Sequence, residues 1–171
     1  MFSERFIDSL FSEIKKMKVM DHEPHESPFS TVHIEYENKS LVFKFSDILK
    51  KMYMRAYFSI LTDTGKNVEP ITIPNNYMSI KVQKTGENHP IHSDAGPETF
   101  GYGDGEELYM SSIIPLNDSY NGGVVRFPED DVSIKLKKGS MMLFPSHGHV
   151  HEVTEVTSGT RYTLLQFWQK S

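Results

Sequence analysis

Short apolar and β-branched runs divide the sequence between residues 77 and 168, and this pattern restricts the possible folds more than any other feature. Each run has the length and composition of a strand, and segments rich in Gly, Pro, Asn, Asp and Ser separate the runs. The expected strands are 77–83, 91–92, 108–116, 123–127, 132–136, 140–144, 149–154 and 161–168. Short strands at this spacing predict a β-sandwich or barrel rather than an α/β sheet.

The preceding residues, 1–76, have a different pattern. Apolar residues from Phe2 to Met17 recur at spacings of four and three, with acidic side chains early and lysines late. This predicts an amphipathic helix over 2–18 that covers a sheet. The other expected elements are strands over 31–37 and 41–45, a second helix over 46–59 and a long connection over 62–76.

Length and composition set limits on the class of protein. The chain of 171 residues is expected to form one domain, with a support region over 1–76 and a β core over 77–171. It has 18 Lys and Arg against 23 Asp and Glu, which argues against nonspecific nucleic-acid binding. The absence of cysteine excludes disulfides and thiolate catalysis and fits a reducing cytosol. No segment approaches the roughly 20 apolar residues of a membrane helix, so a soluble chain is expected.

The stretch from residue 143 to residue 168 carries histidines at alternate positions 147, 149 and 151. Residues i and i+2 of a strand share a face, so His149 and His151 would point the same way, as a metal site requires. Arg161 follows ten residues after His151. A turn over 157–160 is expected to fold the arginine strand back beside the histidine strand. A buried arginine needs an anion or water.

His92 and Asp94 offer an imidazole and a carboxylate at i and i+2, just before a glycine-rich segment. The pair His33 and Glu35 has the same spacing but lies in an early hairpin without a later partner. Two histidines and one carboxylate occupy one face of an octahedral Fe(II) and leave three positions open, as oxygen activation requires. A non-redox metal remains an alternative at this point.

Several motifs in a fixed order complete the pattern between residues 77 and 169. They are His92-x-Asp94, Pro115-Leu-Asn-Asp118, Gly122-Gly123, Phe127-Pro-Glu129, Lys138-Gly-Ser140, Leu143-Phe-Pro145, His151-x-Val153-x-x-Val156-x-x-Gly159-x-Arg161 and Trp168. In this order the sequence resembles the prolyl 4-hydroxylase-like branch of the Fe(II)- and 2-oxoglutarate-dependent dioxygenases. The resemblance implies a mainly β fold with supporting helices (α+β), built on a double-stranded β-helix or jelly-roll core.

The resemblance also implies an activity and its cofactors. The enzyme would use Fe(II), 2-oxoglutarate and O2, with ascorbate as a further reductant, to hydroxylate an aliphatic C–H, and would release succinate and CO2. A peptidyl proline is one candidate substrate; another side chain, a free amino acid and a nucleotide remain open. The alternative function is a cupin-like metal-binding module without oxygenase activity.

Carried over by position, the iron ligands and catalytic residues would be His92, Asp94 and His151. His149 is the alternative to His151. Arg161 would bind the distal carboxylate of 2-oxoglutarate, because its planar fork donates two parallel hydrogen bonds. Thr163 would share the face of the arginine and add a hydroxyl donor.

The remaining cosubstrate positions rest on the resemblance alone. Ser111, Ile113 and Val125 match pocket-lining positions. Gln83 stands where many relatives carry a tyrosine, and its amide, or else Tyr77 or Tyr109, would replace that hydroxyl. The expected partner is a peptide or small-molecule substrate, with neither nucleic acid nor membrane, and the oligomeric state is left open. The compact, cysteine-free chain suggests a microbial or viral source, and thus a cytoplasmic location, in the host if viral.

Overall fold

The computed structural model describes residues 3–16, 30–33, 71–72, 78–95 and 108–170, together with positions 47, 50, 51, 53–55, 58 and 59. The elements within these residues are α1 (Glu4–Ile14), β1 (Ser30–His33), β2 (Ile71–Thr72), β3 (Met78–Lys84), β4 (His89–His92), β5 (Leu108–Pro115), β6 (Tyr120–Gly122), β7 (Val125–Phe127), the 3-10 turn η1 (Pro128–Asp130), β8 (Val132–Ile134), β9 (Met142–Pro145), β10 (His151–Val153) and β11 (Val156–Lys170).

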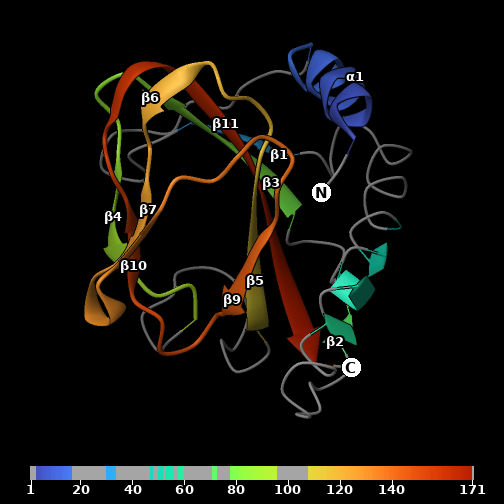
Figure 1. The fold of residues 1–171 in the computed structure, drawn as a ribbon, viewed down its shortest axis with the longest axis vertical. Coiled ribbons are helices and arrows are strands. Elements are labelled where there is room, and N and C mark those ends of the chain that lie inside the picture. Colours follow the sequence, from blue (N-terminus) through green and yellow to red (C-terminus); the bar gives the residue numbers. More distant parts are fainter. Residues whose placement is uncertain are drawn as a thin grey trace.

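Two antiparallel sheets form the core of the structure (Figure 1). The large sheet has the order β1-β3-β11-β5-β9, with β2 and β6 also paired to β11, and the small sheet has the order β4-β10-β7-β8. From β3 onward the chain passes repeatedly between the two sheets, so the strands interleave as in a jelly roll. The predicted double-stranded β-helix with supporting helices is therefore confirmed.

Alternation along the strands divides the apolar side chains between two clusters. Ile114 and Leu164 belong to the cluster that includes α1, whereas Ile113 belongs to a cluster with Phe144 from the neighbouring strand β9 and Val125 from the facing sheet. Successive side chains of a strand point to opposite faces, so one face of the large sheet is covered by the helix and the other faces the small sheet. The cavity described below lies on this second, inner face.

Helix α1 lies on the outer face of the large sheet, away from the small sheet (Figure 1). The Ser3 hydroxyl accepts a hydrogen bond from the Phe6 amide and so caps the first turn. Ile7, Leu10 and Ile14 form the buried stripe. The helix expected over 2–18 is thus confirmed over Glu4–Ile14, and the described positions from 47 to 59 are helical as expected.

Strand β11 is the central strand, and its course corrects one prediction. The turn expected over 157–160 is wrong, because Val156–Lys170 is one continuous strand. Gly159, with φ of +79°, allows a close approach rather than a reversal: a Cβ there would lie 2.4 Å from the Ser119 carbonyl oxygen. The chain turns earlier, at residues 154–155, and Arg161 therefore lies beside β3 rather than beside the histidine strand.

Two short strands were missed. β6 (Tyr120–Gly122) lies in a polar segment expected to be a turn, and β2 (Ile71–Thr72) lies in the expected long connection. Both pair with β11, a contact that local composition does not reveal. Of the strand expected over 31–37, the structure describes Ser30–His33. Outside the described residues lie 34–37, the strand expected over 41–45, and Tyr77.

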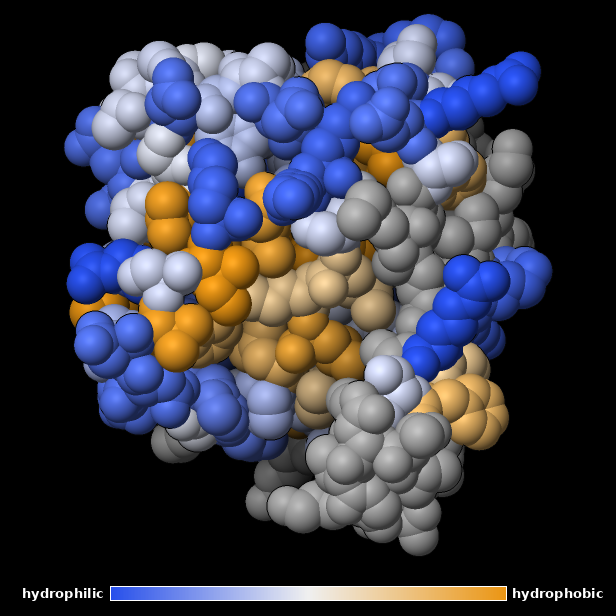
Figure 2. Space-filling model, viewed as in Figure 1, coloured by the Kyte–Doolittle hydropathy of each residue, from blue (hydrophilic) through white to orange (hydrophobic). Residues whose placement is uncertain are grey.

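The surface in the same view is divided into apolar and charged regions. Figure 2 shows apolar side chains gathered in the middle of this face, over β7, β10 and β9, with hydrophilic side chains around them. Ile91 and Val132, on the small sheet, are among the large apolar side chains that remain exposed. Within the described residues, no helix is long and apolar enough to span a membrane.

Candidate active site

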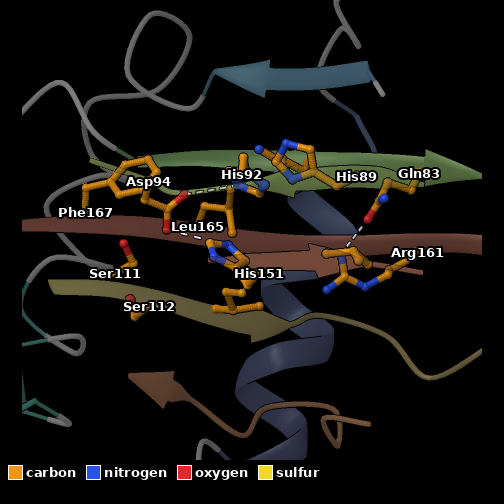
Figure 3. A pocket seen from close by; sticks show the side chains of 13 residues that line it. Gln83, His89, His92, Asp94, Ser111, Ser112, His151, Arg161, Leu165 and Phe167 are labelled. Carbon is orange, nitrogen blue, oxygen red and sulfur yellow. Dashed lines mark hydrogen bonds and ion pairs between the residues drawn. The ribbon is translucent and has the colours of Figure 1, made fainter. Parts of the chain in front are cut away.

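Two histidines and an aspartate converge on the inner side of the small sheet. β4 and β10 are antiparallel neighbours in which His92 and His151 are register partners, so the two side chains lie side by side. The Nε2 atom of His92 is 3.3 Å from one Asp94 oxygen, and the Nε2 atom of His151 is 3.8 Å from the other. One ligand atom from each residue lies within 4.8 Å of the others. Figure 3 shows the three side chains pointing toward one another.

Backbone carbonyls orient both imidazoles. Nδ1 of His92 donates to the Pro90 carbonyl oxygen at 2.9 Å, and Nδ1 of His151 donates to the His149 carbonyl oxygen at 3.1 Å. A carbonyl only accepts, so each Nδ1 carries a proton and Nε2 is the ring nitrogen directed toward Asp94. Burial lowers the pKa of His151, which favours the neutral form of that ring. Both rings are therefore held in an orientation that offers Nε2 to a metal.

Asp94 is held as a carboxylate. Burial alone would raise the pKa of its carboxyl group, but hydrogen bonds with His92 and Ser111 and electrostatic interactions with the two histidines outweigh burial and hold the pKa below its ordinary value. The Ser111 hydroxyl is itself fixed by a 2.8 Å contact with the Ser146 hydroxyl. A carboxylate flanked by the Nε2 atoms of two imidazoles is a ready ligand set for a divalent cation.

Arg161 lies at the other end of the same cavity, on β11. Its guanidinium is buried, and Nη1 donates to Oε1 of Gln83 on β3 at 2.6 Å. Burial lowers the pKa of Arg161, while Tyr120 acts in the opposite direction through its charge and a hydrogen bond. Gly123 leaves room for this side chain, because a Cβ there would lie 2.7 Å from Cδ of Arg161.

Several buried polar atoms around Arg161 have no hydrogen-bond partner in the part of the chain that the structure describes. They are Nε of Arg161, Nε2 of Gln83 and Oγ1 of Thr163. Unsatisfied buried donors are costly and are uncommon in folded proteins. A carboxylate placed against the arginine would accept from these donors, so this end of the cavity fits the far end of a dicarboxylate. The donor set thus fits both parts of an iron and 2-oxoglutarate site.

The cavity joins the two ends. It is partly open to solvent, and residues of β3, β4, β5, β10 and β11 line it. Figure 3 shows Arg161 and Gln83 at one side, Phe167 and Ser111 at the other, and the histidines between them.

The structure separates the expected pocket residues into two groups. Gln83, Ser111 and Ile113 line the cavity, as expected. Val125 packs in the apolar cluster between the sheets, and Thr163 is buried on the face of Arg161, but neither is among the lining residues. Tyr109 is half-buried and is also not among them.

The other described histidine side chains, those of His89, His147 and His149, lie beside the cluster or apart from it. His149 points to Asp130 on η1, 3.8 Å away, and 41% of its side chain is exposed. It precedes β10 rather than belonging to the strand, so it does not share the inward face of His151. His147 is exposed. The side chain of His33 and all of Glu35 lie outside what the structure describes.

The residues in or beside the cavity that were not singled out from the sequence for this site include two that can carry charge, Lys81 and His89, and a tyrosine, Tyr120. Lys81 and His89 line the cavity, and Tyr120 contacts Arg161. The His89 and His92 ring centroids are 3.8 Å apart. The only sequence signal for Lys81 was its spacing of two residues from Gln83, which places both side chains on the same face of the strand. The signal for Tyr120 was absent, because β6 was not predicted.

Comparisons with known proteins agree with this fold and site. Residues 76–169 match the model of the 2OG-Fe(II) oxygenase superfamily, and the chain belongs to that family. A PKHD-type hydroxylase from Parvibaculum lavamentivorans is 33% identical over 92 residues, covering 52% of this chain and 40% of that protein. The chain spans less than half the length of the curated relatives it matches.

Solved structures share the fold. A prolyl-4-hydroxylase from Pseudomonas putida superposes with a TM-score of 0.70 at 14% identity, over 99% of this chain and 89% of that one. A prolyl hydroxylase from Trichoplax adhaerens, in complex with a hypoxia inducible factor oxygen degradation domain peptide fragment, superposes with a TM-score of 0.64 at 12% identity, over 96% and 76%.

Proposed function

We propose that this protein is an Fe(II)- and 2-oxoglutarate-dependent dioxygenase that hydroxylates an aliphatic C–H bond. The observation that carries the proposal is the pairing of two sites in one cavity: the His92, Asp94 and His151 cluster, and the buried Arg161 with unsatisfied donors around it. A metal-binding module without oxygenase activity would account for the cluster. It gives no reason to bury a guanidinium at the other end.

His92, Asp94 and His151 would hold the iron through two Nε2 atoms and one carboxylate oxygen. Such a set leaves positions open for the keto acid and for oxygen. When bound together, Fe(II), 2-oxoglutarate and O2 supply the oxidation of a C–H bond, with release of succinate and CO2. The protein supplies ligand orientation through the two carbonyl contacts and a cavity lined in part by apolar side chains.

Arg161 would bind the distal carboxylate of 2-oxoglutarate. Its Nη1 already donates to Gln83, whereas the buried Nε has no partner among the described residues and is available to the cosubstrate. The Gln83 amide nitrogen and the Thr163 hydroxyl would add neutral hydrogen bonds at the same end. Gln83 would thereby take the place of the tyrosine hydroxyl expected at this position. Val125 would contribute only through packing against Ile113, which lines the cavity.

Cosubstrate turnover tests the proposal. Purified protein with Fe(II), 2-oxoglutarate, O2 and ascorbate is expected to form succinate slowly even without the natural substrate. His151→Ala and Arg161→Met should each abolish succinate formation, whereas His149→Ala and Arg126→Met should retain it. Arg126 is a matched control, because it is exposed and pairs with Glu152. Succinate formation that persists in Arg161→Met would contradict the assignment.

A peptidyl proline is the substrate class we propose to examine first. Support comes from the shared fold with prolyl hydroxylases, one of them in complex with a peptide fragment. Proline-containing peptides, other peptides, free amino acids and nucleotides should be compared for stimulation of succinate formation. Stimulation by a proline peptide with a mass gain of one oxygen is the expected result. Stimulation by the other compounds alone would overturn the proline assignment and leave the dioxygenase assignment intact.

A further inference from the structure

The proposed iron ligands His92, Asp94 and His151 are called the metal cluster below. Lys81 lines the same cavity but belongs neither to this cluster nor to the proposed carboxylate site around Arg161. It is half-buried on β3 and lines the cavity beside the histidines. Its side chain shares a strand face with Gln83, two residues on, whose amide oxygen accepts from Arg161. The cavity therefore contains two cationic side chains as well as the carboxylate of Asp94.

The register of the large sheet places Lys81 between the two ends of the cavity. Gln83 pairs with Arg161, and Lys81 pairs with Thr163, one step further along β11. Two residues further along β11, Leu165 lines the cavity and pairs with Ile113. Another two residues on, Phe167 pairs with Ser111, and Ser111 hydrogen-bonds Asp94. Each step of two residues is about 6.6 Å. Lys81 is therefore one step from Arg161 in the direction of the metal cluster.

The charges around Lys81 agree with this placement. Burial lowers the pKa of Lys81 to about 8, the Asp94 carboxylate opposes that shift, and Arg161 adds to it. The charge of Lys81 in turn acts on His89 and His151. The amine thus interacts with groups of the metal cluster as well as with the arginine.

2-Oxoglutarate carries two carboxylates, and Arg161 can bind only the one at its own end of the cavity. The other carboxylate would lie at the metal, where the ligand set of the protein already includes the anionic Asp94. We propose that Lys81 is a second cosubstrate-binding residue, whose ammonium group contacts the carboxylate of 2-oxoglutarate nearer the metal. This inference rests on the proposed function. It predicts that Lys81 determines affinity for 2-oxo acids in general, whereas Arg161 determines the preference for a distal carboxylate.

Binding of two ligands distinguishes contacts to the keto-acid end of the cosubstrate from contacts to its distal carboxylate. 2-Oxopentanoate has the keto acid of 2-oxoglutarate but lacks the distal carboxylate. The binding of both compounds should be measured by calorimetry on Mn(II)-loaded protein, which binds without turnover. Lys81→Met is expected to weaken both ligands by a similar factor of roughly tenfold, as the loss of one charge-assisted hydrogen bond would give. Lys81→Arg should retain most of the affinity for both.

Arg161→Met serves as the matched comparison. It is expected to weaken 2-oxoglutarate alone and to leave 2-oxopentanoate unchanged. Equal affinity of Lys81→Met and wild type for both ligands would overturn the proposal, and so would a loss confined to 2-oxoglutarate, which would place the amine at the distal end. Failure of the wild type to bind 2-oxoglutarate at all would instead overturn the proposed function. Retained Mn(II) affinity and thermal unfolding temperature show that a variant is folded.

Discussion

At the scale of single residues, the site depends on buried groups whose protonation is set by their surroundings. Burial lowers the pKa of both His89 and His151, and the charge of Lys81 adds to the effect on His89. Asp94 is the opposite kind of group: its pKa is low, so it stays ionised through the neutral range. Histidines with lowered pKa make the folded protein bind fewer protons than the unfolded chain.

The metal-free protein should therefore lose stability as the pH falls below about 6.5, where the histidines of the unfolded chain take up protons and those of the folded protein do not. His89→Gln should reduce that loss between pH 7 and pH 5. Asp94 does not contribute in this range, because its lowered pKa matters only below about 3.8. Urea unfolding at the two pH values measures the difference. Identical pH dependence in wild type and variant would contradict this account of His89.

Gly123→Ala should displace the arginine. The new Cβ would lie 2.7 Å from Cδ of Arg161, and φ of +59° adds backbone strain, so the variant should lose about 1–3 kcal/mol of stability and much of its 2-oxoglutarate affinity. Gly86→Ala is the control, since its φ is +91° and its Cβ would meet nothing within 4 Å. It should lose some stability but keep its affinity. Equal affinity losses in both variants would show that contact with Arg161 is not the cause.

Thr163→Val tests whether the buried hydroxyl is kept for the cosubstrate. The Thr163 hydroxyl has no hydrogen-bond partner among the described residues, so removing it should leave the ligand-free protein equally stable or stabilise it by about 1 kcal/mol. Affinity for 2-oxoglutarate should fall several-fold, as for the loss of one neutral hydrogen bond. Denaturant unfolding and calorimetry measure the two effects. A less stable variant with unchanged affinity would show that the hydroxyl serves the fold.

At the scale of elements, the two faces of the large sheet have separate tasks. The outer face packs on α1, and the inner face carries the cavity. Leu10 on α1 is 5% exposed, so Leu10→Ala should cost about 2–5 kcal/mol. Metal and 2-oxoglutarate affinities should not change, because the cavity lies beyond the sheet. A loss of ligand affinity in the folded variant would show that the two faces are coupled.

Sequence patterns predicted the strands well where alternation and turn residues are local signals, as in β3, β5 and β11. They did not predict β2 or β6, which are short strands stabilised by pairing with β11. The turn expected at Gly159 was wrong because a glycine that permits close packing has the same sequence signature as one that permits a reversal. The order of motifs along the sequence thus identified His92, Asp94 and His151, whereas the position of Arg161 depends on the pairing of β11 with β3.

Lys81 illustrates the same limit within the site. A lysine in a strand is ordinarily a solvated residue, and only its register beside Thr163 shows that it faces the cavity. Its role in cosubstrate binding, like those of His92, Asp94, His151 and Arg161, stays a prediction. The same holds for the division of the chain into a support region over 1–76 and a catalytic core over 77–171.

At the scale of the whole molecule, two interleaved sheets bring the His92, Asp94 and His151 cluster beside one sheet to face Arg161 on the other, in a chain that belongs to the 2OG-Fe(II) oxygenase superfamily. Ligands that bind the folded state should therefore stabilise the whole domain. Mn(II) and 2-oxoglutarate at about 100 times their dissociation constants should each add about 2.7 kcal/mol, and thermal unfolding should report the gain. 2-Oxoglutarate that leaves the unfolding temperature unchanged at saturating Mn(II) would contradict a shared site.

The most direct test of the central claim is an anaerobic titration of the protein with Fe(II) and 2-oxoglutarate, followed by visible absorption. The account predicts a charge-transfer band that requires both additions, and it predicts that the band is lost in His151→Ala and persists in His149→Ala. A wild-type protein that binds both components without developing the band would show that the keto acid does not reach the iron. That result would contradict the assignment.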